Sequence, residues 1–187
     1  MPRPRHWRQW MIILSLAISA VACSQIPTPL GSSTLNTGYR EEQPALSGNG
    51  RFLAFVSNRN GGRRILLYDL QARSLVDLPG LNRLGAIAES PSLSYTGRYI
   101  AYIIDDRGKP TIALYDRVNQ QSVPIANWYG SQVRNPNISP DGRFIVFESG
   151  SRGQWDIQLI DRGANIDLDI PPTPVLSGQG GGGAGEK

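Results

Sequence analysis

One pattern of 28 residues occurs three times in this chain, and this repeat limits the folds that the chain can adopt. Residues 43–70, 90–117 and 135–162 align without a gap, and successive copies begin 47 and 45 residues apart. The aligned positions are Pro44, Pro91 and Pro136; Ser47, Ser94 and Ser139; Gly50-Arg51, Gly97-Arg98 and Gly142-Arg143; and Asp69, Asp116 and Asp161. A chain with repeats of this length is built from stacked copies of one small unit, because a single unit cannot bury its own apolar surface.

Each copy predicts a small antiparallel sheet. The Pro-x-x-Ser segment predicts a short first strand that starts at the Pro, because Pro has no amide hydrogen to donate to a neighbouring strand. The segments that follow, such as FLAFVS at 52–57, are apolar along most of their length, which is typical of strands buried on both faces. A hairpin turn and a third strand complete the repeat, and weaker fourth strands are expected at 74–79, 121–126 and 165–170.

The turns have the most specific local sequences. Gly50, Gly97 and Gly142 are expected at positive φ, and Asp141 is expected to hold its turn by bonding to the nearby backbone. The aligned Asp at the end of each third strand is also expected to form a turn. The neighbouring carboxylates Asp105 and Asp106 suggest a cation site or acid-base chemistry, but the same position is a hairpin turn in the other two copies. A structural role is therefore favoured for this pair.

Four-stranded units that recur at this interval are typical of β-propeller blades, which are covered on both faces by their neighbours. The sequence therefore predicts an all-β fold of three four-stranded blades, at about 43–82, 90–128 and 135–170, in a propeller domain of residues 43–176. Three blades leave one face of blade 1 and the opposite face of blade 3 without a neighbour in the chain. We expect a homodimer that completes a six-bladed ring. The alternatives are pairing with another half-propeller and capping of the open arc by residues 24–42.

The blade sequences resemble the repeat of TolB-type propellers, and residues 136–145, PNISPDGRFI, carry this resemblance most clearly. TolB is the periplasmic propeller of the bacterial Tol-Pal system, and the resemblance covers about residues 43–170. It implies a non-catalytic scaffold that binds an envelope protein, such as a Pal-like lipoprotein, or that acts in biopolymer transport. This chain departs from TolB proteins in two features. TolB proteins have an N-terminal α/β domain and usually six blades, whereas a Pro-, Ser- and Thr-rich linker precedes the first blade here.

The N-terminus has the pattern of a secretory signal. Residues 1–22 contain three arginines, no acidic residue and a short apolar run that ends in Ala20-Val21-Ala22, which predicts a signal peptide and export to the periplasm. Cys23, the only cysteine, follows directly and matches a lipobox. We predict that Cys23 is lipidated and that residues 23–42 are a linker from a membrane anchor; ordinary signal-peptide cleavage is the alternative. Residues 177–187 are expected to form a flexible Gly-rich tail.

The composition narrows the possible chemistry. The only histidine, His6, lies in the predicted signal peptide, so the mature chain has neither the residues of a Ser-His-Asp or Cys-His site nor those of a zinc site. We expect no cofactor, no metal and no catalytic residue. The mature chain has 16 basic and 15 acidic side chains, which removes the electrostatic motive for binding nucleic acid. A fragment or accessory propeller of a carboxylate-dependent or peptidase-associated hydrolase is the alternative function.

The segment between the second and third copies is the candidate for partner binding. Loops on a rigid scaffold commonly carry binding residues, and Trp128, Tyr129 and Arg134 have the composition of an interface hot spot. Packing of Trp128 between blades is the competing interpretation. Trp155 is expected to pack between blades.

Overall fold

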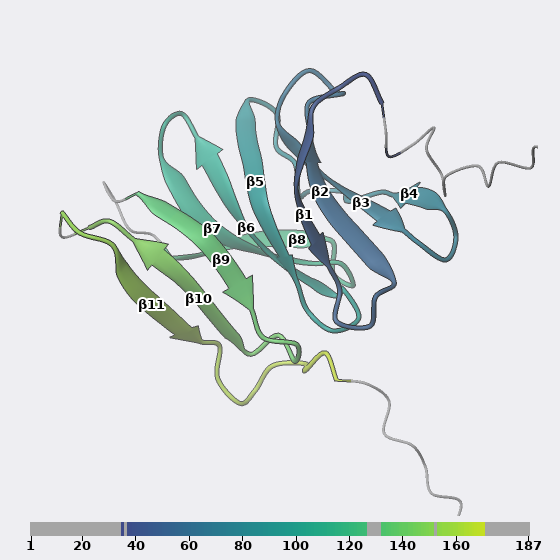
Figure 1. Cartoon of the computed structure of the whole chain (residues 1–187). Helices are drawn as coiled ribbons and strands as arrows, with labels where there is room; N and C mark the ends of the chain where they lie inside the picture. The colour runs from purple at the N-terminus through teal and green to yellow at the C-terminus, as the bar shows by residue number, and fades with distance from the viewer. Residues whose placement is uncertain (1–34, 36, 127–131, 152, 171–187) are drawn as a thin grey trace, which may run out of the picture. The chain divides into compact units, whose positions relative to one another are not determined.

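The computed structural model describes residues 35, 37–126, 132–151 and 153–170, and these residues form three antiparallel sheets, one for each copy of the repeat (Figure 1). Blade 1 consists of β1 (Glu41–Leu46), β2 (Phe52–Ser57), β3 (Arg64–Asp69) and β4 (Ser74–Val76). Blade 2 consists of β5 (Ala86–Leu93), β6 (Tyr99–Asp106), β7 (Pro110–Asp116) and β8 (Gln121–Ala126). Blade 3 consists of β9 (Val133–Ile138), β10 (Phe144–Ser149) and β11 (Asp156–Asp161). The predicted all-β fold is confirmed, and in the described part of the chain no helix is long and apolar enough to span a membrane.

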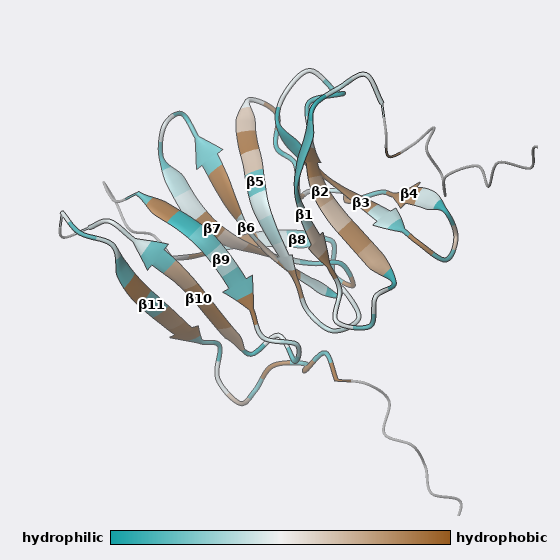
Figure 2. Ribbon diagram, in the orientation of Figure 1, coloured by the Kyte–Doolittle hydropathy of each residue, from teal (hydrophilic) through white to brown (hydrophobic). Residues whose placement is uncertain are grey.

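The apolar core lies in two layers, one between blades 1 and 2 and one between blades 2 and 3. Because successive side chains of a strand point to opposite faces, β6 contributes to both layers. Ile100, Tyr102 and Ile104 enter the layer shared with blade 1, and Tyr99, Ala101 and Ile103 enter the layer shared with blade 3. Figure 2 shows the apolar residues of β6 as brown segments between paler and teal ones. Blade 2 is thus covered on both faces, as the apolar strand sequences predict.

The three aligned prolines do not begin the first strands, which corrects the prediction. Pro44, Pro91 and Pro136 lie inside β1, β5 and β9, and the pairing register of each strand shifts at this point. The residue before each Pro has a φ of +53° or +54°. A β-bulge leaves one residue unpaired, so a Pro without an amide hydrogen is accommodated within the strand.

The turn between the first and second strands has the same conformation in all three blades. Gly50 and Gly97 have a φ of +71° and Gly142 a φ of +79°. In blade 3, Asp141 accepts hydrogen bonds from the Ser139 hydroxyl and from the backbone N–H of Arg143. These hydrogen bonds, the one from Ser139 first, lower the pKa of Asp141. The turn carboxylate therefore stays ionised at neutral pH and holds the backbone of the turn.

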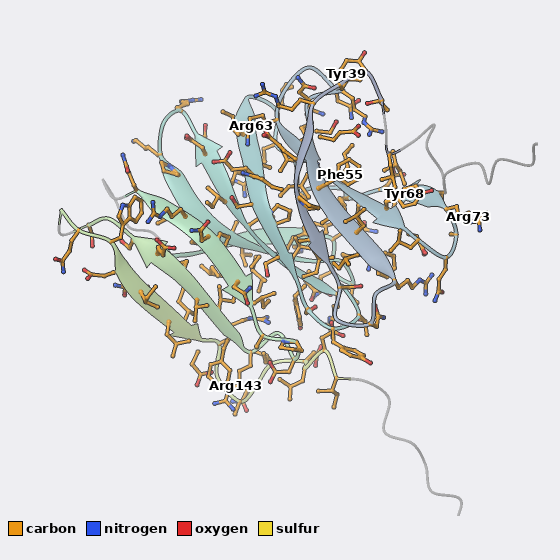
Figure 3. The ribbon with its side chains drawn as sticks, viewed as in Figure 1. Tyr39, Phe55, Arg63, Tyr68, Arg73 and Arg143 are labelled. Carbon is orange, nitrogen blue, oxygen red and sulfur yellow. The ribbon has the colours of Figure 1, made fainter. Side chains whose placement is uncertain are left out.

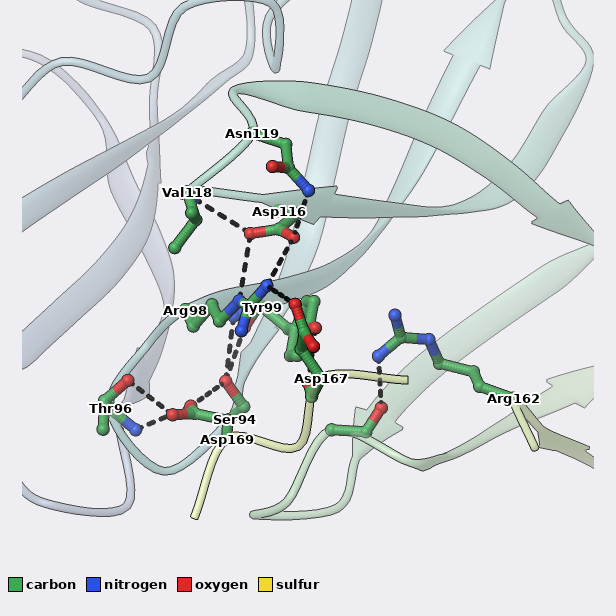
Figure 4. A network of polar contacts seen from close by, with 11 residues as sticks. Ser94, Thr96, Arg98, Tyr99, Asp116, Val118, Asn119, Arg162, Asp167 and Asp169 are labelled. Carbon is green, nitrogen blue, oxygen red and sulfur yellow. Dashed lines mark hydrogen bonds and ion pairs between the residues drawn. The ribbon is translucent and has the colours of Figure 1, made fainter. Parts of the chain in front are cut away.

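The C-terminal segment 165–170 was predicted to be the fourth strand of blade 3 but forms no strand. It lies against the turn of blade 2 instead (Figure 4). Asp169 is buried there and accepts hydrogen bonds from the Ser94 hydroxyl at 2.5 Å, the Thr96 N–H at 2.8 Å and the Thr96 hydroxyl at 2.6 Å. Thr96 stands where the third blade has Asp141. Asp169, which lies far from this turn in the sequence, thus supplies the carboxylate that the turn of blade 2 lacks.

Candidate functional site

In blades 1 and 2, one set of side chains points toward the following blade. We call this set, and the aligned set in blade 3, the forward face of the blade. In blade 1 the forward face comprises Phe52, Ala54, Val56, Ile65 and Leu67. In blade 2 it comprises Tyr99, Ala101, Ile103, Ile112 and Leu114. The aligned residues of blade 3 are Phe144, Val146, Glu148, Ile157 and Leu159. They alternate along their strands with residues that pack on blade 2, so they point away from it.

The three forward faces differ sharply in exposure. Every forward-face residue is at most 6% exposed in blade 1 and at most 4% exposed in blade 2. In blade 3, by contrast, Phe144 is 37%, Ile157 73% and Leu159 62% exposed. The register pairs Val146 with Leu159 across β10 and β11, so these apolar residues form a continuous strip on one side of the sheet. Blade 3 therefore exposes the same kind of surface that blades 1 and 2 bury.

The two closed junctions between blades share one contact around the first aromatic residue of the forward face. In the first junction the Arg117 guanidinium of blade 2 lies over the Phe52 ring, 4.2 Å from its centroid. In the second, the guanidinium of Arg162 in blade 3 lies 4.3 Å from the centroid of the Tyr99 ring. A cation over an aromatic face contributes about 0.5–2 kcal/mol, more when it is shielded from water. The turn glycine of the following blade packs on the same ring, since a Cβ added to Gly97 would lie 3.2 Å from Phe52.

Phe144 occupies the equivalent position in blade 3 and has half of this arrangement. The guanidinium of Arg143, the residue before it, lies 4.9 Å from the ring centroid. The same local contact occurs in the other blades, between Arg51 and Phe52 and between Arg98 and Tyr99. Within the part of the chain that the structure describes, no second guanidinium lies over Phe144. Among the described residues, this ring therefore lacks the arginine that the following blade supplies to Phe52 and Tyr99.

An ion pair within each blade supports the base of the forward face. Arg51 donates to Asp69 at 2.8 Å, Arg98 to Asp116 at 3.2 Å and Arg143 to Asp161 at 2.9 Å. Figure 3 labels Arg143 beside the strands of blade 3. These pairs join the start of the second strand to the end of the third, which the sequence analysis did not foresee although both residues recur at constant spacing.

The carboxylates of these pairs also hold the turn that follows the third strand. Asp69 accepts from the backbone N–H groups of Gln71 and Ala72, and Asp161 accepts from Gly163 N–H. The hydrogen bond from the paired arginine is the main cause that lowers the pKa of Asp69 to about 2, and the same cause lowers the pKa of Asp161 to about 2. The turn-forming role and the ion pair therefore coexist in one residue.

A charged cluster forms the other end of the blade 3 forward face. Glu148 stands where blades 1 and 2 have Val56 and Ile103. It accepts hydrogen bonds from Arg134 at 2.7 Å and from Asn135 at 2.8 Å. These bonds, the one from Asn135 first, lower the pKa of Glu148. The Glu148 carboxylate is therefore ionised and already paired.

Arg134, one of the predicted binding residues, also stacks on an aromatic side chain. Its guanidinium lies 3.7 Å from the centroid of the Trp155 ring. Trp155 is half-exposed and carries the Arg134 guanidinium of its own blade, so it does not pack between two of the described blades. Trp128 and Tyr129, the other predicted binding residues, lie outside the described residues. The strip of Phe144, Ile157 and Leu159 was not named from the sequence as a site, although the alignment places all three on the uncovered face.

Comparison with solved structures supports the propeller fold. The chain matches TolB from Acinetobacter baumannii at 24% identity and a TM-score of 0.58, over 67% of this chain and 30% of that one. It matches a TolB-type protein from Agrobacterium tumefaciens at 21% identity and a TM-score of 0.54, over 64% of this chain and 42% of that one. A puromycin-hydrolyzing peptidase of Mycobacterium tuberculosis matches at 15% identity and a TM-score of 0.51, over 73% and 22% of the two chains. No protein-family model and no curated protein matches the sequence. The described residues thus have a TolB-like propeller fold, and the chain spans less than half the length of each of these structures.

Proposed function

We propose that this chain is an exported, non-catalytic scaffold that binds another protein of the cell envelope through the forward face of blade 3. The observation that carries the proposal is the exposed apolar strip of Phe144, Ile157 and Leu159. The corresponding residues of the other two blades are buried by a neighbouring blade. Contiguous exposed apolar surface is uncommon on soluble proteins and marks sites of interaction.

The charged end of the same face suits a protein interface. Arginine and tryptophan are enriched among the residues that dominate binding energy, and Arg134 and Trp155 are stacked on each other at this end. Burying a charge is most costly when the charge has no partner. Glu148 is already paired with Arg134, so a protein that covers this end leaves neither of these two charges unpaired. An apolar strip beside a paired charged cluster therefore resembles the core and rim of an interface.

The electrostatics of the carboxylates support a non-catalytic role. A general acid at neutral pH needs a carboxyl pKa raised toward 7. Asp69, Asp141, Glu148 and Asp161 instead have lowered pKa values, caused by hydrogen bonds from arginine, asparagine or serine side chains. In the described residues, no group of three potential metal ligands gathers. These carboxylates serve as structural acceptors.

The TolB-like fold suggests which partners to test first. A Pal-like lipoprotein or a component of a biopolymer transport system is the partner class that this likeness favours. The predicted signal peptide and lipidation of Cys23 fit such a location, because an acyl chain supplies membrane affinity that the nearly neutral mature chain lacks. Cys23→Ser is expected to move the protein from the membrane to the soluble fraction.

In-cell photo-crosslinking tests the proposed binding surface. A benzoylphenylalanine placed at Leu159, in cells that naturally produce the chain, should form an adduct with another protein. The same probe at Val118, which is 68% exposed in a turn of blade 2, is the matched control and should form none. Absence of any protein adduct from position 159 would refute the proposal. The alternative of an accessory propeller for a hydrolase uses the same face, and an adduct with a hydrolase would favour it.

A further inference from the structure

The two closed junctions define what a partner of a forward face looks like. Each junction places an arginine over the first aromatic residue of the forward face, and this arginine directly follows the Asp that ends the third strand of the next blade. Arg117 follows Asp116 in the first junction, and Arg162 follows Asp161 in the second. The same contact therefore occurs twice in one molecule, between residues at matching repeat positions.

These arginines are held in place by their own blades. Arg117 donates from Nη1 to the carbonyl oxygen of Gly97 at 3.1 Å, and Arg162 donates from Nη1 to that of Gly142 at 2.6 Å. The backbone N–H of each arginine also bonds to the carbonyl of the turn arginine in its own blade. A blade of this type presents a turn glycine and a fixed guanidinium side by side, and both fit against one aromatic ring.

The residue at the matching position of blade 1 is Leu70, whose backbone N–H makes the same bond to Arg51. Blade 1 of a second copy would bring Gly50 to Phe144 but no guanidinium. The other face of blade 1, which points away from blade 2, includes Phe55 and Tyr68 (labelled in Figure 3), and both are buried, at 4% and 2% exposed. Leu35, from the segment before β1, lines a hollow together with Phe55. Blade 1 thus lacks the arginine that closure by a second copy requires at Phe144.

We propose that the forward face of blade 3 seats a propeller blade of another polypeptide, and that this blade carries a turn glycine and an Asp-Arg pair at the end of its third strand. The inference rests on the proposed function and specifies the partner class. The partner's guanidinium lies over the Phe144 ring in addition to Arg143, as Arg117 lies over the Phe52 ring in addition to Arg51. The apolar face of the partner blade covers Ile157 and Leu159, as blade 2 covers the equivalent residues Ile65 and Leu67 of blade 1.

The test identifies the peptide that a benzoylphenylalanine at Ile157 crosslinks in cells that naturally produce the chain. We expect a peptide from another protein with a strand that ends in Asp-Arg. Phe144→Leu should lower the adduct yield about tenfold because it removes the aromatic face, and Phe144→Trp should preserve the yield. Phe144→Leu should leave the melting temperature of the purified chain unchanged, which separates loss of binding from loss of folding.

The other outcomes overturn the inference in distinguishable ways. A crosslinked peptide from a protein without propeller blades would refute the proposed partner but leave the binding function intact. A peptide from residues 52–70 of a second copy would instead establish the homodimer predicted from the sequence. Equal adduct yields from the Leu and Trp variants would exclude a cation over Phe144. Absence of any protein adduct would refute the proposed function as well.

Discussion

Tyr99 and Phe144 occupy the same position of the repeat, yet their surroundings differ. Tyr99 is almost completely buried, and the guanidinium groups of Arg98 in its own blade and Arg162 in the next blade both lie over its ring. Its hydroxyl donates to the carbonyl of Asp167 at 2.6 Å. Phe144 has a similar local sequence and the same stacked arginine on one side, but no following blade in the described part of the chain. The repeat therefore indicates what each forward face can contact, and among the described residues only the faces of blades 1 and 2 make that contact.

The largest expected effect comes from truncating these two aromatic residues. Tyr99→Ala should lower the free energy of unfolding by about 3–5 kcal/mol, because it empties a buried site in a packed junction. Phe144→Ala should lower it by less than about 1 kcal/mol, since its ring is partly exposed. Urea denaturation of the two variants measures both values. Equal losses would show that the forward face of blade 3 is covered within the chain.

A second comparison uses the turn glycines. Gly142→Val should destabilise the chain by roughly 2–5 kcal/mol, because strain at positive φ adds to a clash of the new side chain with the Tyr99 ring. Gly50→Val should cost only the strain, about 1–3 kcal/mol, since a Cβ there would meet nothing within 4 Å. Thermal unfolding of both variants gives the difference. A Gly50 variant as unstable as the Gly142 variant would contradict the distinction between turns inside and outside a junction.

A third prediction concerns Asp169, whose carboxylate binds the turn of blade 2. Asp169→Ala should cost about 1.5–3 kcal/mol, because it removes a buried acceptor that satisfies Ser94 and Thr96. The control is Asp167→Ala, whose carboxylate is 80% exposed and makes one ion pair with Arg98, and which should change stability by less than about 1 kcal/mol. Chemical denaturation of the two variants should separate them. Similar values for both would mean that Asp169 contributes no more than a surface charge.

The smallest effect tests whether the ion pair of each blade is independent of the junction. Asp69 and Asp161 both have a folded pKa near 2, below the ordinary value of 3.8. Their contribution to stability is therefore complete above about pH 4 and is lost as the pH falls toward about 2. Carboxyl-carbon NMR titration should give equal midpoints for the two groups, and Arg51→Met should raise only that of Asp69. A midpoint for Asp161 near 3.8 in the wild type would show that the pair needs a neighbouring blade.

Much of the fold could be predicted because the same strand and turn residues recur in all three copies of the repeat. The apolar sequences of β2, β6 and β10 indicated the central strands, and the Gly-Arg pairs indicated the turns. The position of the prolines was misjudged, because a bulge accommodates Pro inside a strand as well as a strand start does. Residues 165–170 alternate like a strand, but the buried hydrogen bonds of Asp169 place them elsewhere. The only trace of this arrangement in the sequence is that the turn of blade 2 has Thr96 where the other two blades have Asn or Asp.

The site was harder to predict than the fold. Arg134 lies at the rim of the open face, but its partners are Glu148 on β10 and Trp155 just before β11, and the repeat pattern does not show which of these side chains meet. The arginine over each aromatic ring was also missed, because Arg117 and Arg162 align with Leu70 and so break the repeat. This difference between blades carries the information about the partner.

Thiol labelling in intact cells tests most directly whether a partner covers the forward face of blade 3. Leu159→Cys and Val118→Cys are compared in cells and after purification, and maleimide modification at each position is read from the peptide mass. Both side chains are exposed in the described structure, so both positions should react in the purified protein. In cells, position 159 should be protected and position 118 should react as before. Equal labelling of position 159 in cells and in the purified protein would contradict the presence of a partner on this face.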